Sequence, residues 1–434
     1  GSLKLNNRMG SVTEQPPVSF QDGRVYETNF VVDKNTISFQ VENFDKSKDI
    51  IIDPGLAWAT YYGGSAADYG SSCEVDGSGN VYLAGYTQST NNIALGGHQN
   101  TVGGDFDVFL VKFNGAGVRQ WATYYGGNLS DVGYSCTVDG SGNVYLAGNT
   151  SSIGNIASGG HQNILGGSTD AYLVKFNSAG VRQWATYYGG TSGETGYSCA
   201  VDRSGNVYLA GNTQSTNNIA LGGHQNSFGL MIDAFLVKFN SAGVRQWATY
   251  YGGSSGDNGF SCAVDGSGNV YLAGRTLSSS NIAIGGHQNS SGGGWDAYLV
   301  KFNGAGVRQW ATYYGGSSGE NGSSCAVDGS GNVYLAGHTQ SISNIASGGH
   351  QNTFGGNYDG FLVKFNGTGV RQWATYYGGN LIEDGSSCAV DGSGNVYLAG
   401  YTQSISNIAS GGHQNTLGGN YDGFLVKFNG TGVR

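Results

Sequence analysis

The sequence is poor in several residue types, and each shortage excludes a class of protein. Only 3 of its 434 residues are proline, only 11% are charged, and the net charge is −9. A weakly charged, acidic chain offers no basic surface to nucleic acid or to an anionic membrane. No apolar run approaches the roughly 20 residues of a membrane span. We therefore expect neither nucleic-acid binding nor membrane insertion.

No secretory leader is visible at the N-terminus. The opening Gly1-Ser2 is typical of a cloning remnant, so a leader could have been removed. Glycine, in contrast, accounts for 79 residues and aromatic residues for 12%. The glycines show no three-residue period, which excludes collagen, and 38% apolar residues exclude a disordered chain. Short strands joined by tight glycine turns are expected.

The motif Trp-Ala-Thr-Tyr-Tyr-Gly-Gly recurs every 63 residues without insertion or deletion. Such a fixed period is typical of repeat architectures. Each unit contains four strand-like runs, named a to d here, and glycine turns of hairpin type separate a from b and c from d. In the second unit the runs are Ser135–Asp139, Val144–Thr150, Ala171–Phe176 and Val181–Tyr188. The tryptophans are Trp58, Trp121, Trp184, Trp247, Trp310 and Trp373.

Runs b and c are apolar on both faces, so each sheet needs a neighbour on either side. Propeller blades cover one another in this way, and an open solenoid is the alternative. The motif 57–64 is a run d without partners, and the last unit ends where its own run d should begin. We therefore expect an all-β, six-bladed β-propeller of four-stranded antiparallel blades over residues 56–434, closed by the N-terminal strand.

Residues 1–55 lie outside the repeat and contain strand-like runs at Val25–Val32, Thr36–Val41 and Asp49–Ile52. We interpret them as a small N-terminal β segment, consisting of a tag remnant and the end of a preceding domain.

The units resemble the bacterial SBBP repeats, which are named for seven-bladed β-propellers. Thr-Tyr-Tyr-Gly-Gly, Val-Asp-Gly-Ser-Gly-Asn-Val-Tyr-Leu-Ala-Gly and Asp-Ala-Tyr-Leu-Val-Lys-Phe-Asn carry the resemblance, which extends from about residue 36 to residue 434. Six units stand here in place of seven. The resemblance implies an exported or cell-surface bacterial protein and transfers no catalytic residue, because fold alone does not give function.

The units differ from one another mainly at the end of each blade that carries the b–c and d–a connections. Binding residues are concentrated on loops held by a rigid scaffold, although neutral drift in solvent is the alternative. The predicted ligand-binding residues open run a, end run b or precede run c. They are Tyr134, Tyr197, Phe260, Tyr86, Arg275, His338, Tyr401 and Trp295.

Every d–a loop also carries an acid, and a ring of such acids would crowd the mouth of the central channel. Oxygen-rich rings suit calcium or a cationic ligand; six solvated carboxylates are the alternative. The predicted metal ligands are Asp68, Asp131, Glu194, Asp257, Glu320 and Glu383.

Each 19-residue b–c connection contains Gly-Gly-His-Gln-Asn, as at His98. Its histidine and glutamine are expected to satisfy loop backbone groups, with a lectin or metal site as the alternative. Six cysteines occupy one position of run a, too far apart for disulfides, so we expect free, buried thiols. They are Cys73, Cys136, Cys199, Cys262, Cys325 and Cys388.

Three functions remain open. A multivalent binding module for glycans or a surface partner, monomeric and extracellular or on the cell surface, is favoured. A polysaccharide lyase or hydrolase at the channel mouth is the first alternative. Its candidate residues are those that occur in one unit only at their position: Arg275, Trp295 and His338. A structural spacer without ligand is the second.

Overall fold

The computed structural model describes residues 3–7, 10–14, 17–21, 24–33, 36–48, 50–53, 58–410, 412 and 414–434. These residues form strands, turns and bends, and none of them forms a helix. Accordingly, no helix of the described residues could cross a membrane. The chain divides into two compact units, Gly1–Tyr61 and Tyr62–Arg434.

The first unit contains two small antiparallel sheets. One pairs β1 (Leu3–Asn7) with β2 (Gly10–Glu14). The other has the order β5-β4-β3-β6, with bounds Thr36–Val41, Arg24–Asp33, Val18–Gln21 and Ile51–Asp53. The three strands expected from the sequence are β4, β5 and β6, although position 49 of the third lies outside the described residues. The pairs β1–β2 and β3–β4 were not predicted.

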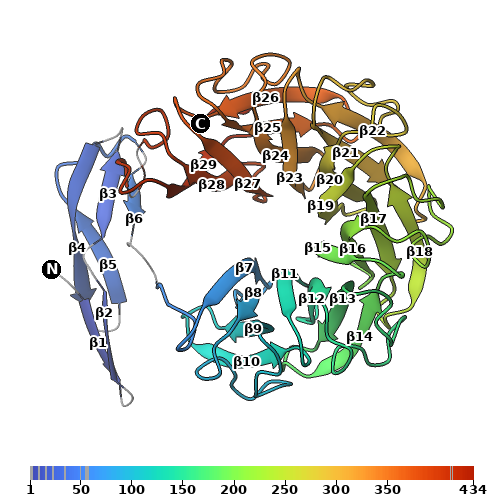
Figure 1. Ribbon diagram of the computed structural model, residues 1–434. Helices are drawn as coiled ribbons and strands as arrows, with labels where there is room; N and C mark the ends of the chain where they lie inside the picture. Colours follow the sequence, from blue (N-terminus) through green and yellow to red (C-terminus); the bar gives the residue numbers. More distant parts are fainter. Residues whose placement is uncertain are drawn as a thin grey trace. The chain divides into compact units, whose positions relative to one another are not determined.

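The second unit contains six antiparallel sheets in chain order, five with four strands and the last with three. Together they are the six blades of a β-propeller (Figure 1). Strands a are β7 (Asp68–Val75), β11 (Asp131–Val138), β15 (Glu194–Val201), β19 (Asp257–Val264), β23 (Glu320–Val327) and β27 (Glu383–Val390). Strands b are β8 (Val81–Thr87), β12 (Val144–Thr150), β16 (Val207–Thr213), β20 (Val270–Thr276), β24 (Val333–Thr339) and β28 (Val396–Thr402).

Strands c are β9 (Asp107–Phe113), β13 (Asp170–Phe176), β17 (Asp233–Phe239), β21 (Asp296–Phe302), β25 (Asp359–Phe365) and β29 (Asp422–Phe428). Strands d are β10 (Arg119–Tyr125), β14 (Arg182–Tyr188), β18 (Arg245–Tyr251), β22 (Arg308–Tyr314) and β26 (Arg371–Tyr377). Strands a lie nearest the centre and strands d at the outer rim (Figure 1).

The core lies between blades. Leu110 of β9 and Leu146 of β12, for example, belong to one buried cluster with Trp121 and Tyr172. Residues of both faces of strands b and c are buried in the inner blades, which explains why these strands are apolar throughout. The expected mutual covering of blades is thus confirmed.

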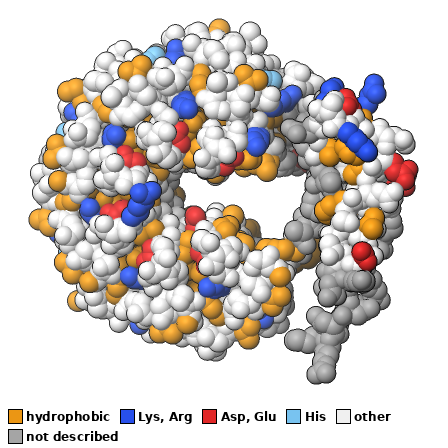
Figure 2. Space-filling view, turned by 180° about the vertical axis from the view of Figure 1, so that it is seen from behind, with side chains coloured by type: hydrophobic (Ala, Val, Ile, Leu, Met, Phe, Trp, Pro, Cys, Tyr) orange, Lys and Arg blue, Asp and Glu red, His pale blue; other side chains and the backbone are white. Residues whose placement is uncertain are grey.

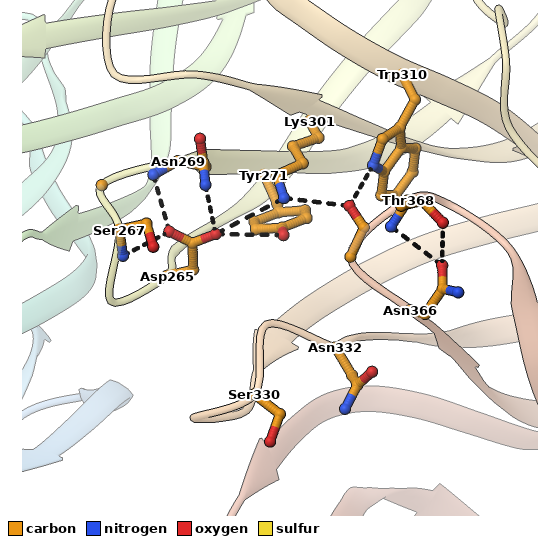
Figure 3. Close-up of polar contacts among 12 residues, drawn as sticks. Asp265, Ser267, Asn269, Tyr271, Lys301, Trp310, Ser330, Asn332, Asn366 and Thr368 are labelled. Carbon is orange, nitrogen blue, oxygen red and sulfur yellow. Dashed lines mark hydrogen bonds and ion pairs between the residues drawn. The ribbon is translucent and has the colours of Figure 1, made fainter.

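Hydrogen bonds to a backbone carbonyl of the c–d turn join each blade to the next, as Figure 3 shows for Lys301 and Trp310. Lys301 of β21 lies 5.1 Å from the ring centroid of Tyr271 and donates to the Gly367 carbonyl of the next blade at 3.2 Å. Trp310 Nε1 donates to the same carbonyl at 3.0 Å. Gly369 of that turn has φ +83 and lies so close that a β-carbon would be 2.8 Å from the Trp310 ring.

The strand expected to close the ring is not formed by the residues that the structure describes. Residues 58–64 form no strand, and β29 has no fourth strand beside it among the described residues. Tyr62 of this segment contacts the first blade: its hydroxyl donates to the Ile93 carbonyl at 2.6 Å and its ring lies 5.0 Å from Phe109. Tyr125 contacts the second blade in the same way through Ile156, but also pairs within β10.

The two end blades are therefore more exposed than the inner ones. Cys73 of β7 is exposed, whereas the five equivalent cysteines are buried. Leu425 of β29 is 73% exposed, whereas Leu362 at the same position of β25 is fully buried. The blades curve round an open centre and leave the arc unclosed between β7 and the sheet β27–β29 (Figure 1).

Candidate functional site

A β-bulge in every strand a places one residue outside the regular pairing. In the second blade, Gly133 pairs with Gly148 and Ser135 with Ala147, which leaves Tyr134 between them without a partner on β12. Bulges re-aim side chains and occur next to functional sites. The six bulge residues lie on the innermost strands and are Ser71, Tyr134, Tyr197, Phe260, Ser323 and Ser386.

Three of these residues form a continuous row across neighbouring blades. The ring centroids of Tyr134 and Tyr197 are 5.3 Å apart, and those of Tyr197 and Phe260 are 5.5 Å apart. All three side chains are half-buried, so part of each ring remains accessible. Burial raises the pKa of both tyrosines, which keeps their hydroxyls protonated at neutral pH.

Arg275 extends this row on the fourth blade. Its guanidinium lies 4.4 Å from the ring centroid of Trp295 and 5.6 Å from that of Phe260. Its Nε donates to Asn258 Oδ1 at 3.2 Å, and Asn258 is the residue opposite Arg275 in the β19–β20 ladder. Five of the predicted ligand-binding residues thus meet in one surface, called the aromatic–arginine row: Tyr134, Tyr197, Phe260, Arg275 and Trp295.

His338 belongs to a second cluster, between the fifth and sixth blades. Its Nδ1 lies 3.1 Å from Asp384 Oδ1, and its ring lies 5.5 Å from that of Tyr358. No ring contact or ion pair links His338 to Arg275 within the part of the chain that the structure describes. The sequence singled out His338 but not Asp384.

Tyr86 and Tyr401 lie at the two ends of the arc, apart from the aromatic–arginine row. Tyr86 stacks on Tyr69 at 4.8 Å and contacts Phe106 at 5.6 Å. Tyr401 contacts Tyr421 at 5.6 Å.

Acidic and basic side chains are interspersed on the face that Figure 2 shows, without a continuous patch of either sign.

The six acids do not lie in the d–a loops, as the sequence predicted, but open strands a. Asp131 is fully buried. It accepts hydrogen bonds from Thr150 Oγ1, from Ser152 Oγ at 2.9 Å and from the Gly127 amide at 2.7 Å. Thr150 ends β12, Ser152 follows it, and Gly127 lies in the connection before β11, so the acid joins strand a to the end of strand b and to the connection that enters the blade. Among the described residues, no three His, Cys, Asp or Glu side chains are grouped to hold a metal ion.

A second carboxylate, at the start of strand c, faces each of five acids across the first glycine of the Tyr-Tyr-Gly-Gly motif. The pairs are Asp107–Asp131, Asp170–Glu194, Asp233–Asp257, Asp296–Glu320 and Asp359–Glu383. Burial first, and then the neighbouring Asp131, raises the pKa of Asp107 to about 6. A calcium ion here would have to replace the hydrogen bonds that already hold each acid, and calcium binding stays a prediction.

Near Asp233, Leu230 replaces the glycine that the other five units have at this position. In the second blade the Gly167 amide donates to Asp170 Oδ1 at 3.0 Å. A β-carbon on Gly167 would lie 1.8 Å from the Ser192 carbonyl, so a leucine cannot take this backbone path. Asp233 Oδ1 is buried without a hydrogen-bond partner, as is Asp296 Oδ1 in the fourth blade, where the glycine is retained as Gly293. Burial, and then Asp257, raises the pKa of Asp233 to about 7.

The Gly-Gly-His-Gln-Asn loops are held by their glutamines. Gln99 donates through Nε2 to the Thr101 carbonyl at 2.9 Å, and its Oε1 accepts from the Gly126 amide at 3.2 Å. His98 instead packs against Phe176 of the next blade at 6.1 Å. The structural interpretation is confirmed for glutamine, whereas the histidine acts through ring packing; His413 lies outside the described residues.

Sequence reasoning missed Asn258, Asp384 and the bulge itself. The register of strands a and b would have identified Asn258, which lies opposite Arg275. It would not have identified Asp384 as the partner of His338, because Asp384 lies opposite Tyr401 in its own blade and meets His338 only where two blades pack together. The bulge residue follows a glycine of strand a in every unit, but this glycine was not interpreted as a sign of a bulge.

Comparison with known families gives two matches. A model described as a β-propeller repeat, SBBP, matches residues 57–93, 120–155, 183–219, 246–282, 309–345 and 372–408. A model described as a domain of unknown function, DUF7948, matches residues 1–55.

Two curated proteins are similar to the chain. Regulatory protein FlaEY of Caulobacter vibrioides is 26% identical over 74% of this chain and 36% of its own length. An uncharacterized WD repeat-containing protein, L264, of Acanthamoeba polyphaga mimivirus is 21% identical over 82% of this chain and 32% of its own length. The chain thus spans about a third of each relative.

Among solved structures, a protein of unknown function from Dyadobacter fermentans aligns with a TM-score of 0.41 at 11% identity, covering 84% of this chain and 96% of its own. The calcium-binding protein regucalcin from Agrobacterium tumefaciens aligns with a TM-score of 0.34 at 11% identity, covering 77% and 83%.

Proposed function

The chain belongs to the SBBP β-propeller repeat family, and from this premise we propose that it is a binding module that holds a glycan on the aromatic–arginine row. The observation that carries the proposal is the contact series Tyr134–Tyr197–Phe260 across three blades. Loops and edges held by a rigid scaffold are where binding residues concentrate. A location outside the cell or on its surface belongs to the same proposal.

The chemistry of the row suits a sugar chain. Pyranose rings present apolar C–H faces that pack against aromatic rings, and their hydroxyls need hydrogen-bond partners. Tyr134 and Tyr197 offer both a ring and a protonated hydroxyl. Because the three rings lie on successive blades, a linear glycan can bind all three at once. After the first sugar has bound, the others bind intramolecularly, which raises the overall affinity.

A glycan array probed with the whole chain tests the proposal, followed by calorimetry on the glycans that bind. We expect Phe260→Ala and Tyr197→Ala each to weaken binding about tenfold or more, since interface aromatics carry roughly 1–4 kcal/mol of binding energy. Ser323→Ala is the matched control, because Ser323 occupies the same bulge position without a ring. Silence across the array, or unchanged affinity in both aromatic variants, would reject the proposal.

A second candidate, a polysaccharide-active enzyme, is favoured by one observation. His338 lies 3.1 Å from a carboxylate oxygen of Asp384, and a carboxylate beside an imidazole orients it as a general base. Turnover of a polysaccharide that disappears in His338→Ala and falls in Asp384→Asn would support this function. Turnover that both variants retain would reject these two residues as its catalysts.

A further inference from the structure

Arg275 carries a charge that the protein does not neutralise. Its Nε is bonded to an uncharged amide, Asn258 Oδ1, and two aromatic rings, Trp295 and Phe260, cover the guanidinium. Among the described residues no carboxylate forms an ion pair with it, and no hydrogen bond engages its two terminal nitrogens. These nitrogens remain available to a ligand.

The surroundings strengthen an electrostatic interaction at this point. Arg275 is half-buried, so an anion bound to it would be screened less than on an open surface. Burial lowers the pKa of Arg275, but a guanidinium remains charged at neutral pH. The aromatic rings restrict its motion, which lowers the entropy lost on binding.

The charge is specific to the fourth blade. The same position at the end of strand b holds Tyr86, Asn149, Asn212, His338 and Tyr401 in the other blades. Asn212, on the neighbouring blade, is engaged with the Gly259 amide at 2.9 Å. The propeller thus presents a single arginine fork next to the rings of the aromatic–arginine row.

We propose that Arg275 makes the site selective for acidic glycans, with its terminal nitrogens binding a carboxylate of a uronic acid or a sulfate ester while a neighbouring sugar packs on the aromatic rings. The inference rests on the proposed glycan-binding function and names its ligand class. A planar guanidinium matches both anions through paired N–H donors. An acidic glycan is favoured over an acidic peptide because the row also offers rings on three blades for packing sugar faces.

The experiment compares oligosaccharides of equal length and linkage: one with uronic acids, the same one with its carboxyl groups reduced, and a sulfated one. Calorimetry on the whole chain should show at least tenfold tighter binding of one or both acidic forms than of the reduced form. That ratio corresponds to about 1.4 kcal/mol. The two acidic ligands distinguish carboxylate from sulfate recognition.

Arg275→Gln should remove the preference while leaving measurable binding of the reduced form, and Arg275→Lys should keep only part of it, because lysine is a point charge. Arg203→Gln is the control, since Arg203 lies in an a–b turn at the other end of its blade. Circular dichroism and thermal unfolding of each variant verify folding.

The outcomes separate the two proposals. Equal affinity of wild type for acidic and reduced forms, or a preference that survives Arg275→Gln, overturns the selectivity inference and leaves glycan binding intact. Absence of binding to every oligosaccharide rejects glycan binding itself. Equally tight binding of a poly-glutamate peptide would overturn the glycan as the occupant of this site.

Discussion

A β-carbon at Gly252 would lie 2.6 Å from Asp233 Oδ1 and 2.6 Å from Asp257 Oδ2. The first glycine of each Tyr-Tyr-Gly-Gly motif is therefore required by space and not by backbone conformation. We expect Gly252→Ala to destabilise the protein by about 1–3 kcal/mol, because overpacking a buried site costs this much. The midpoint of urea unfolding measures the effect.

Gly140→Ala is the matched control, because no atom lies within 4 Å of a β-carbon there. Its effect should stay within about 0.5 kcal/mol. Equal effects of the two substitutions would contradict the close contact at Gly252.

The buried carboxylate of Asp233 predicts a pH dependence of stability. Its pKa in the folded state is about 7, raised first by burial and then by Asp257, against about 3.9 when unfolded. The stability that it contributes is therefore complete below about pH 4 and is lost as the pH rises through about 7. Asp233→Asn should gain stability relative to wild type between pH 5 and pH 8, by roughly 1–3 kcal/mol.

The matched variant is Asp170→Asn, whose position retains the Gly167 amide donor. Its gain relative to wild type should be smaller over the same pH range. Urea unfolding at pH 5 and pH 8 compares the three proteins, and a difference between Asp233→Asn and wild type that does not change with pH would contradict the raised pKa of Asp233.

At the scale of the element, the blade is a sheet whose edges are joined to its neighbours by side-chain hydrogen bonds. Trp310 donates to the Gly367 carbonyl of the next blade at 3.0 Å, and the same contact occurs at Trp121, Trp184, Trp247 and Trp373. Trp310→Phe keeps most of the packing but removes this hydrogen bond and leaves Lys301 as the donor to the Gly367 carbonyl. We expect a loss of about 0.5–1.5 kcal/mol in unfolding free energy, the usual contribution of one hydrogen bond.

Gln309→Ala serves as the control in the same strand. Gln309 is exposed, and its amide donates only to the nearby Val307 carbonyl at 3.0 Å. A change within about 0.5 kcal/mol is expected for it. A Trp310→Phe variant as stable as wild type would show that the Trp310 hydrogen bond does not stabilise the contact between these blades.

At the scale of the whole molecule, the open arc leaves one thiol accessible. Cys73 is exposed, and the other five cysteines are buried. Burial raises the pKa of Cys136, Cys262 and Cys388 to about 12, which removes the reactive thiolate at neutral pH. A maleimide at pH 7 should therefore label one cysteine per native chain and six after unfolding in urea.

Mass spectrometry identifies the labelled residue, and Cys73→Ser should abolish native labelling. Protection of Cys73 would show that another strand or blade covers β7 in solution. Rapid labelling of the buried cysteines would show that blades separate.

The sequence alone determined the 63-residue unit, its four strands and the propeller. It also placed Arg275, Phe260 and Trp295 near one end of the blade. These features follow from alternation, turn glycines and repetition, which can be read from neighbouring residues. Tertiary structure alone decided which of these side chains meet. The bulge that aligns Tyr134, Tyr197 and Phe260 depends on a two-strand register. The burial of the acids depends on donors such as Thr150 and Ser152, 19 and 21 residues away from Asp131. The open arc depends on where residues 58–64 pack, which no local pattern specifies.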